Sequence, residues 1–208
     1  MVSASIEREL TAEAFPVRNG VFVAVVGPSG AGKDTVIGYA KARFAGETRL
    51  EFVRRVITRQ SDAASEDHDT LADAAFAEAE ADGAFSLCWD AHGLRYGLPA
   101  DVDWAVANGH VAVANVSRAV IPALRERYAN MAVVEITAAP EILAERLAAR
   151  GRESRGEVLA RLARSTSVKL TGPDVTSIDN SGDKDVAGER FAEVLRKAMA
   201  FSDLSDMI

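Results

Sequence analysis

The sequence predicts an α/β fold in which a parallel sheet is flanked by helices in three layers. Short apolar segments rich in valine and alanine alternate with segments of helical periodicity through most of the chain, an order that favours parallel strands covered on both faces. The first apolar segment, Val21–Val26, runs directly into a glycine-rich turn that ends at Lys33. Late in the chain, residues 146–164 hold six arginines and no lysine.

The turn after the first strand has the spacing of a phosphate-binding loop. Its glycines permit backbone conformations closed to other residues and let main-chain N–H groups approach an anion. Lys33 opens a helix whose N-terminus adds partial positive charge, and its ammonium can reach the outer phosphates of a nucleotide. The expected nucleotide-binding residues are Gly27, Pro28, Ser29, Gly30, Ala31, Gly32, Lys33, Asp34 and Thr35.

One position departs from the usual form of this loop. A serine or threonine normally follows the lysine and binds magnesium, whereas this chain has Asp34 there and Thr35 next. Either side chain offers an oxygen to a hard cation. Both therefore remain candidate Mg²⁺ ligands.

Composition limits the classes of protein that fit. The 208 residues suit one domain over 20–208, preceded by an arm over 1–19 that we expect to be loosely held. A net charge of −7 gives a nucleic-acid partner no electrostatic support. The single cysteine, Cys88, excludes an internal disulfide and suits the reducing cytoplasm, and its apolar neighbours indicate inert burial. No apolar stretch has the length of a membrane span.

Strands and helices are assigned from apolar spacing, β-branched content and turn residues. After Val21–Val26, strands are expected at Phe52–Ile57, Ala84–Trp89, His110–Asn115, Ala132–Thr137 and Val175–Ile178. Helices are expected directly after Lys33, at Thr70–Asp82, at Asp101–Asn108, from Pro140, around Arg161 and Arg164, and at Val186–Phe201. Asp90–Pro99 is rich in glycine and polar atoms, so we expect a loop outside the core.

Capping residues support several of these boundaries. Thr70 and Asp73 are spaced like a capping pair, and Gly83 is placed to end the helix that they would begin. Ser117 can cap a helix after the strand that ends at 115, and Pro140 suits a first helical turn.

The arginine-rich segment has two interpretations. It could be a solvated helical face whose arginines pair with Glu145, Glu153 and Glu157. It could instead be a lid over about residues 146–165 that brings guanidinium groups over a transferring phosphoryl group. The phosphate-binding loop favours the lid, with Arg152, at the turn, and Arg161, on the returning helix, as the preferred residues.

With these motifs in one order, the chain resembles the guanylate kinase-like P-loop kinases. Within that group it resembles the ribose 1,5-bisphosphate phosphokinases of phosphonate degradation. The motifs that carry the closer resemblance span residues 21 to about 165, and they are Gly27–Asp34, Arg55–Arg59, Glu66 with His68, Trp89–Gly97, Asn115–Arg118 and Arg146–Glu153.

Two departures from guanylate kinases bear on the acceptor. Those enzymes bind the guanine edge with a carboxylate where this chain has Ser117, followed by Arg118. They also carry an arginine shortly after the Thr-Arg pair, where this chain has Gln60, Ser61 and Asp62. Losing a buried partner for guanine costs about 1–3 kcal/mol. The sequence therefore favours a small, highly phosphorylated acceptor over a purine nucleotide.

The resemblance implies phosphoryl transfer from ATP, with Mg²⁺, to ribose 1,5-bisphosphate, giving 5-phosphoribosyl 1-diphosphate and ADP. No general base is needed, because a phosphate monoester has a second pKa near 6 and is ionised at neutral pH. The catalytic residues implied are Lys33, Arg150, Arg152 and Arg161, and Asn180 would lie near the adenine. An acceptor lobe over about 52–98 is implied, and the substrate-binding residues are Arg55, Thr58, Arg59, Glu66, His68, His92, Tyr96, Ser117 and Arg118.

Other functions stay open at this point. The nearest is a nucleoside monophosphate kinase acting on GMP, and a second is a non-catalytic guanylate kinase-like binding module, although such modules tend to lose the lysine that Lys33 supplies. A kinase with a hydroxyl acceptor would need a base, for which Asp90 or Glu66 is available. Tyr96 and Trp89 could equally be packing residues, Glu66 and His68 exposed loop residues, and His92 an ordinary loop residue. A homodimer is compatible with the sequence.

Overall fold

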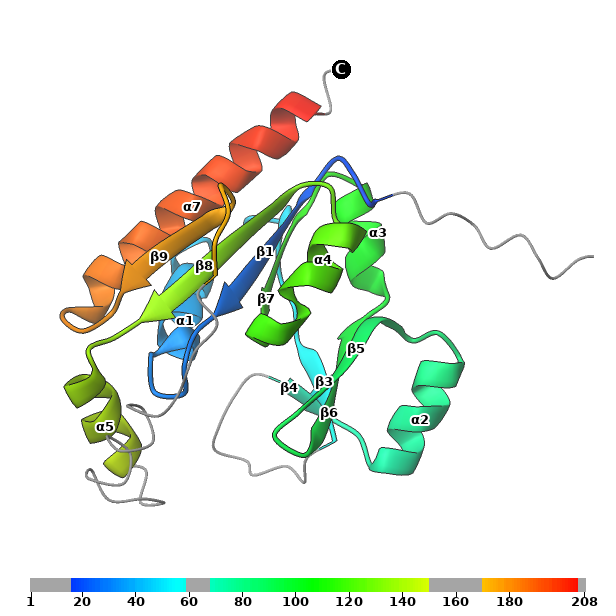
Figure 1. Cartoon of the computed structure of the whole chain (residues 1–208). Helices are drawn as coiled ribbons and strands as arrows, with labels where there is room; N and C mark the ends of the chain where they lie inside the picture. Colours follow the sequence, from blue (N-terminus) through cyan, green and yellow to red (C-terminus); the bar gives the residue numbers. More distant parts are fainter. Residues whose placement is uncertain (1–15, 59–67, 150–169, 206–208) are drawn as a thin grey trace, which may run out of the picture.

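A five-stranded parallel sheet forms the centre of the computed structural model, which describes residues 16–58, 68–149 and 170–205. Its strands are β1 (Val21–Val26), β2 (Leu50–Phe52), β7 (Val111–Asn115), β8 (Met131–Thr137) and β9 (Val175–Asp179). They lie in the order β2-β7-β1-β8-β9, and every pair is parallel. The carboxyl ends of all five strands therefore meet at one edge, and Figure 1 shows β1, β8 and β9 pointing toward it.

Helices cover both faces of this sheet, as expected. On one face α1 (Lys33–Arg43) and α7 (Lys184–Ser205) pack together, and on the other lie α3 (Asp101–Ala107) and α4 (Ile121–Arg127). Another helix, α5 (Pro140–Ala148), follows β8 in the chain. The three-layer α/β fold predicted from the sequence is confirmed.

β1 occupies the middle of the sheet, and all six of its residues are buried. Val21, Val23 and Val25 point to the core beneath α1 and α7, and the alternate residues point to the core beneath α3 and α4. A strand buried on both faces needs this continuous apolar run. The glycine-rich turn that follows is thus attached to a strand that is buried along its whole length.

A second, four-stranded sheet lies beyond the carboxyl ends of the first (Figure 1). It consists of β3 (Arg55–Ile57), β4 (His68–Thr70), β5 (Phe85–Ala91) and β6 (Leu94–Pro99), in the order β4-β3-β6-β5. β6 runs antiparallel to both neighbours, whereas β3 and β4 are parallel. α2 (Asp73–Ala81) packs on it through Phe76, whose ring stacks on Phe85 at 4.6 Å between centroids.

The expected single strand over Phe52–Ile57 is wrong, since the chain divides there between the two sheets. β2 ends at Phe52, and the amide of Val53 still donates to the carbonyl of Val113 at 2.9 Å. Arg54 then turns outward and binds Asp69 through two nitrogens, before β3 begins at Arg55. The residues on both sides of Val53 and Arg54 have the apolar pattern of a strand. The pattern alone therefore does not reveal that the chain passes from one sheet to the other at this point.

The expected loop over Asp90–Pro99 is also wrong. β5 and β6 form a hairpin whose turn contains His92 and Gly93, both in the left-handed region at φ 54° and 74°. Gly97 lies inside β6 because the Phe85 ring fills the space beside it, where an added Cβ would come within 2.6 Å of that ring. The glycines that suggested a loop therefore form a tight turn and a close packing contact.

The expected helix caps were correct at some helices and wrong at others. α2 begins at Asp73 after Ala72, without a side-chain cap, and Thr70 belongs to β4, so the expected capping pair is wrong. Gly83 does follow that helix, at φ 74°. Ser117 caps as expected, accepting from the amide of Ala119 at 3.3 Å, at the start of a short 3₁₀ helix over Arg118–Val120.

The last residues of the N-terminal arm are bound to the domain. Val17 forms a parallel bridge with Tyr128, its amide donating to Arg127 and its carbonyl accepting from Ala129. The side chain of Asn19 donates to the carbonyl of Ala107 at 2.9 Å. The described part of the arm, 16–19, is thus held rather than loose. Among the described residues, no helix is both long and apolar enough to cross a membrane.

Candidate active site

The glycine-rich turn lies where the sequence placed it, between the tip of β1 and the start of α1. Gly27, Gly30 and Gly32 have φ values of 148°, 85° and 88°. A Cβ on Gly27 would lie 2.2 Å from the carbonyl oxygen of Ile136, and one on Gly32 would lie 2.3 Å from the side-chain nitrogen of Asn180. Conformation and close packing both require glycine here. The loop is therefore shaped to bring its backbone amides around an anion.

The helix that follows leaves its first amides open to a ligand. Gly32 is the N-cap of α1 in a left-handed conformation, and it provides no side-chain cap. The ammonium of Lys33 folds back over the loop and donates to the carbonyls of Gly27 and Pro28 at 3.0 and 3.2 Å. Its charge thus lies over the loop, where the phosphates of a nucleotide would meet both the amides and the lysine.

Two side chains from distant parts of the sequence brace the loop from below. Asn180, which directly follows β9 and is 2% exposed, donates to the carbonyl of Ala31 at 2.8 Å. Arg146 of α5 donates to the carbonyls of Gly30 and Asn180 at 3.4 and 2.9 Å. Asn180 therefore contacts the loop backbone itself, and its proximity to adenine stays a prediction. Sequence reasoning missed Arg146, because its bracing role depends on where α5 docks.

Oxygen atoms suited to Mg²⁺ lie next to the loop. Asp34 and Thr35 stand exposed in the first turn of α1, and Asn115, at the carboxyl end of the adjacent strand β7, donates to Asp34 Oδ1 at 3.3 Å. Mg²⁺ is typically bound by one or two carboxylates together with substrate phosphates. The donor set fits such an ion. Asn115 was not singled out as a ligand from the sequence, and the pairing of β1 with β7 is what brings it there.

A cavity of about 200 Å³ opens beside this group, between α1 and the two sheets. Asp34 and Asn115 lie at the end nearest the loop, and Arg55 enters from β3. The remaining lining residues are Ile37, Gly38, Lys41, Phe52, Val53 and Val113. The crossing of the chain at Val53 therefore forms part of the wall that joins the second sheet to the phosphate-binding loop.

Arg55 is the most deeply placed cation of the second sheet. It is 8% exposed, and its guanidinium carbon lies 5.7 Å from the centre of the Tyr96 ring. Tyr96 in turn stacks on Trp89 at 5.3 Å. The two aromatic residues thus pack against each other while Tyr96 also supports Arg55. Arg55 and Tyr96 are brought together as the prediction of a common site requires.

Three other predicted acceptor residues have mixed surroundings. Thr58 accepts from the amide of Arg95 at 2.9 Å, so its hydroxyl helps to join β3 to β6. His68 lies opposite Arg55 in β4, and its buried Nδ1 has no hydrogen-bond partner among the described residues. His92 is exposed at the tip of the β5–β6 hairpin. Substrate contact by these three stays a prediction.

Ser117 and Arg118 lie past the end of β7. The serine hydroxyl is used as the cap described above. Arg118 donates to Glu135 Oε1 of β8 at 2.9 Å, and these side chains are 25% and 17% exposed. Glu135 stands opposite Val26 in the sheet, so this ion pair lies at the base of the phosphate-binding loop. Arg59, Glu66, Arg150, Arg152 and Arg161 lie outside the described residues, as does most of the expected lid.

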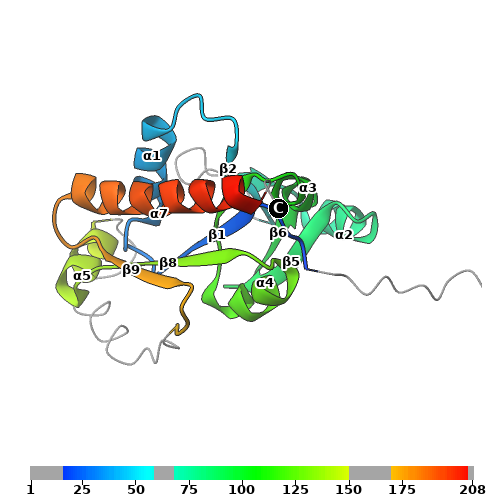
Figure 2. The same cartoon turned by 90° about the horizontal axis from the view of Figure 1, so that it is seen from above.

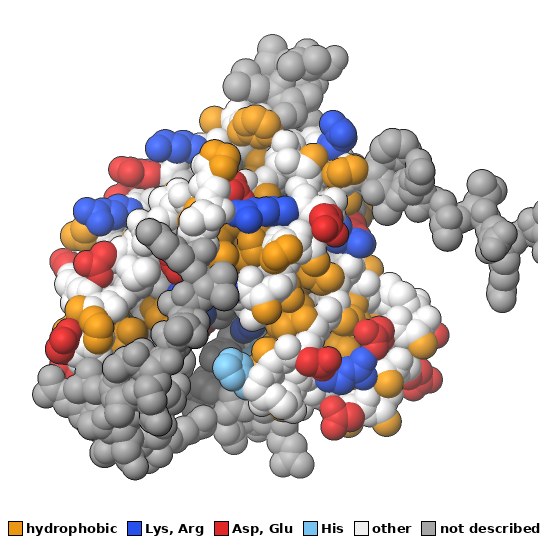
Figure 3. Space-filling model, viewed as in Figure 1, with side chains coloured by type: hydrophobic (Ala, Val, Ile, Leu, Met, Phe, Trp, Pro, Cys, Tyr) orange, Lys and Arg blue, Asp and Glu red, His pale blue; other side chains and the backbone are white. Residues whose placement is uncertain are grey.

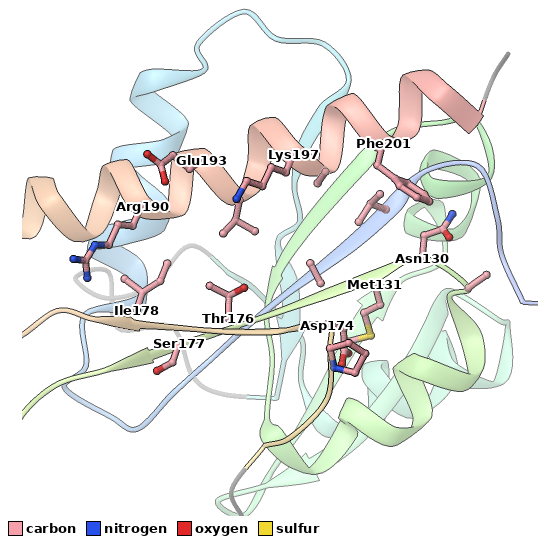
Figure 4. Close-up of a pocket in the computed structure, with 16 residues that line it drawn as sticks. Asn130, Met131, Asp174, Thr176, Ser177, Ile178, Arg190, Glu193, Lys197 and Phe201 are labelled. Carbon is pink, nitrogen blue, oxygen red and sulfur yellow. The ribbon is translucent and has the colours of Figure 1, made fainter.

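The surface is hollowed between the parallel sheet and the second sheet, and a basic side chain and a histidine are visible in the recess (Figure 3). A larger cavity, about 750 Å³, lies elsewhere, between α7 and strands β8 and β9. Figure 4 shows Arg190, Glu193 and Lys197 of α7 over this groove and Thr176 and Ser177 of β9 below it. No residue of the phosphate-binding loop lines it, so its size does not make it the active site.

Comparisons with known proteins agree with this arrangement. No protein-family model matches the chain. The ribose 1,5-bisphosphate phosphokinase PhnN of Chelativorans sp. (strain BNC1) is 55% identical over 211 residues, which cover 100% of both chains. The chain belongs to the ribose 1,5-bisphosphate phosphokinase family. PhnN of Brucella melitensis is 51% identical over 178 residues, covering 86% of this chain and 93% of that relative.

The fold of this chain is similar to that of a solved structure. Guanylate kinase from Anaplasma phagocytophilum aligns with a TM-score of 0.59, covering 86% of each chain at 15% sequence identity. The fold is therefore that of the guanylate kinase-like P-loop kinases. The resemblance inferred from the motifs is confirmed, and the protein is a kinase of this family.

Proposed function

We propose that this kinase transfers the γ-phosphoryl group of ATP to ribose 1,5-bisphosphate, giving 5-phosphoribosyl 1-diphosphate and ADP. The observation that carries the proposal is the cavity that joins Asp34 and Asn115, beside the phosphate-binding loop, to the buried guanidinium of Arg55. A buried arginine suits a phosphate group through paired donors. At about 200 Å³ the cavity suits a small sugar phosphate, being below the usual range for sites of drug-sized ligands.

The reaction can proceed without a general base. The product has its diphosphate on C1, so an oxygen of the 1-phosphate attacks the γ-phosphorus, a new P–O bond forms, and the bond to the β–γ bridging oxygen breaks. The electron pair of that bond leaves on ADP. Because the attacking phosphate is ionised at neutral pH, the protein supplies position and positive charge rather than proton transfer.

The residues divide this task between the two substrates. The loop amides and Lys33 hold the phosphates of ATP, and Asn180 with Arg146 keeps the loop in shape. Asp34, Thr35 and Asn115 are the residues that would hold Mg²⁺, which neutralises charge on the phosphates when bound. Arg55 and Arg118 draw the acceptor toward the loop. Arg150, Arg152 and Arg161 are proposed to close on the transferring group.

A coupled assay for ADP with three acceptors tests the proposal. Ribose 1,5-bisphosphate should support turnover, while ribose 5-phosphate and GMP should support little, and the product should be identified by its mass and phosphorus spectrum. Brisk turnover of GMP without turnover of the bisphosphate would assign the chain to the nucleoside monophosphate kinases instead. Absence of turnover with every acceptor, despite ATP binding, would favour a binding module.

A further inference from the structure

Lys41 lines the far end of the small cavity and has no role in the site as described so far. It stands on α1 two helical turns after Asp34, and both side chains line the same cavity. A rise of 1.5 Å per residue separates their backbones by about 10 Å along the helix. Lys41 Nζ lies 5.6 Å from the centre of the Phe52 ring, another lining residue. The cavity thus has one end beside the phosphate-binding loop and another beside a lysine.

The surroundings of this lysine favour an anion. Loss of hydration lowers the pKa of Lys41, and the neighbouring charge of Arg54 lowers it further, whereas Asp34 acts in the opposite direction. Arg55 brings a second cation to the same cavity. A doubly charged phosphate between Lys41 and Arg55 would offset the loss of hydration at Lys41 and would accept hydrogen bonds from both side chains.

We propose that Lys41, together with Arg55, binds the non-reacting 5-phosphate of the acceptor. This inference rests on the proposed function, since it places the two phosphates of ribose 1,5-bisphosphate at the two ends of one cavity. The 1-phosphate lies at the end formed by Asp34 and Asn115, next to the nucleotide, and the sugar lies along the apolar wall that includes Ile37 and Val113. Selection of ribose 1,5-bisphosphate over ribose 1-phosphate then follows, because Lys41 and Arg55 bind the second phosphate.

The test separates the two phosphates of the acceptor. Lys41→Met removes the charge and keeps an unbranched stem, Lys41→Arg restores the charge, and Arg43→Met removes an exposed cation from the same helix as the matched control. Competitive inhibition by ribose 5-phosphate and by ribose 1-phosphate reports on each end alone. Circular dichroism and thermal unfolding establish that each variant is folded.

In Lys41→Met, the KM for ribose 1,5-bisphosphate and the Ki for ribose 5-phosphate should rise by about 10- to 100-fold, the range for losing a charge-assisted hydrogen bond. The Ki for ribose 1-phosphate, the KM for ATP and the saturating kcat should change by less than about threefold. Lys41→Arg should recover most of the affinity, and Arg43→Met should resemble the wild type.

Two results would overturn the inference: an unchanged KM for the bisphosphate in Lys41→Met, or a parallel rise in the Ki of both monophosphates. Failure of the proposed function gives a different result, which is a wild-type protein that makes no ADP from ribose 1,5-bisphosphate. Lys41 is then judged by calorimetry with ribose 5-phosphate alone. Binding that is lost in Lys41→Met and kept in Arg43→Met supports a phosphate site at Lys41, and equal binding by all three proteins overturns it.

Discussion

The two sheets of this protein contribute to its site in different ways. The parallel sheet is buried on both faces at β1, and at its tip it offers backbone amides, a lysine and three glycines that packing and conformation require. The second sheet is only partly buried, and it offers side chains, above all Arg55 supported by Tyr96. We infer that nucleotide binding depends on backbone shape, whereas the choice of acceptor depends on side-chain chemistry.

The largest effect is expected at the loop of the parallel sheet. Lys33→Ala should lower kcat at least about 100-fold, because it removes a fixed positive charge from the transferring phosphates. The unfolding temperature should stay close to that of the wild type, since the loop conformation depends on its glycines and on Asn180 and Arg146. Steady-state kinetics and calorimetry measure both quantities, with the exposed Lys197→Ala as control. Near-normal turnover in Lys33→Ala would end the assignment of the loop.

Two glycines allow the sheets to be compared directly in stability. In Gly27→Ala the new methyl group would meet the carbonyl oxygen of Ile136 at 2.2 Å, and φ of 148° disfavours alanine as well. Neither backbone can easily move, so we expect a loss of about 3 kcal/mol or more in the free energy of unfolding. In Gly97→Ala the obstacle is the partly exposed Phe85 ring, which can rotate, and the loss should be about 1–2 kcal/mol.

Urea unfolding of both variants measures this difference. The comparison is sharpened if Gly27→Ala also raises the KM for ATP while Gly97→Ala leaves it unchanged, because only the first glycine shapes the loop. Equal losses in the two variants would mean that the tip of β1 is no more rigid than the second sheet.

The same contrast explains which features the sequence predicted. β1 and the phosphate-binding loop were predicted correctly, because a strand buried on both faces and a loop of required glycines leave local signals. β6 was missed, since Gly97 is there to accommodate Phe85, a contact that depends on the pairing of β5 with β6. The division of Phe52–Ile57 between two sheets was missed for a similar reason.

Side chains of the site were likewise predictable only where the signal is local in the sequence. Arg55 could be chosen from its motif, but its place in a cavity with Lys41 depends on β2 pairing with β7 and on the crossing at Val53. Arg146 was noted only as one arginine of a cluster, because its partners, the carbonyls of Gly30 and Asn180, are 116 and 34 residues away. Contacts over such separations leave no periodic pattern in the sequence.

A smaller effect is expected at the junction between the sheets. Arg118→Ala should raise the KM for the acceptor about tenfold and leave the KM for ATP unchanged, since one charged contact to a phosphate is lost. Glu135→Gln, which only weakens the hold on Arg118, should raise the same KM by less. Steady-state kinetics with both substrates varied measures these constants. An unchanged acceptor KM in Arg118→Ala would remove this arginine from the acceptor site and leave it as a partner of Glu135 alone.

The smallest effect on turnover is expected at the thiol of the second sheet. Loss of hydration, together with Glu80, which accepts from the thiol, raises the pKa of Cys88 to about 11. A raised pKa keeps the thiol neutral, so at pH 8 its reactive thiolate should be about 100-fold scarcer than for an ordinary cysteine, and its alkylation correspondingly slow. The rate should climb about tenfold per pH unit toward pH 11, which timed alkylation followed by mass measurement can test.

Alkylated protein should retain its kcat, because the second sheet selects the acceptor without taking part in the transfer. Rapid alkylation at pH 8 that abolishes kcat would contradict that division, because chemistry would then depend on a residue of β5.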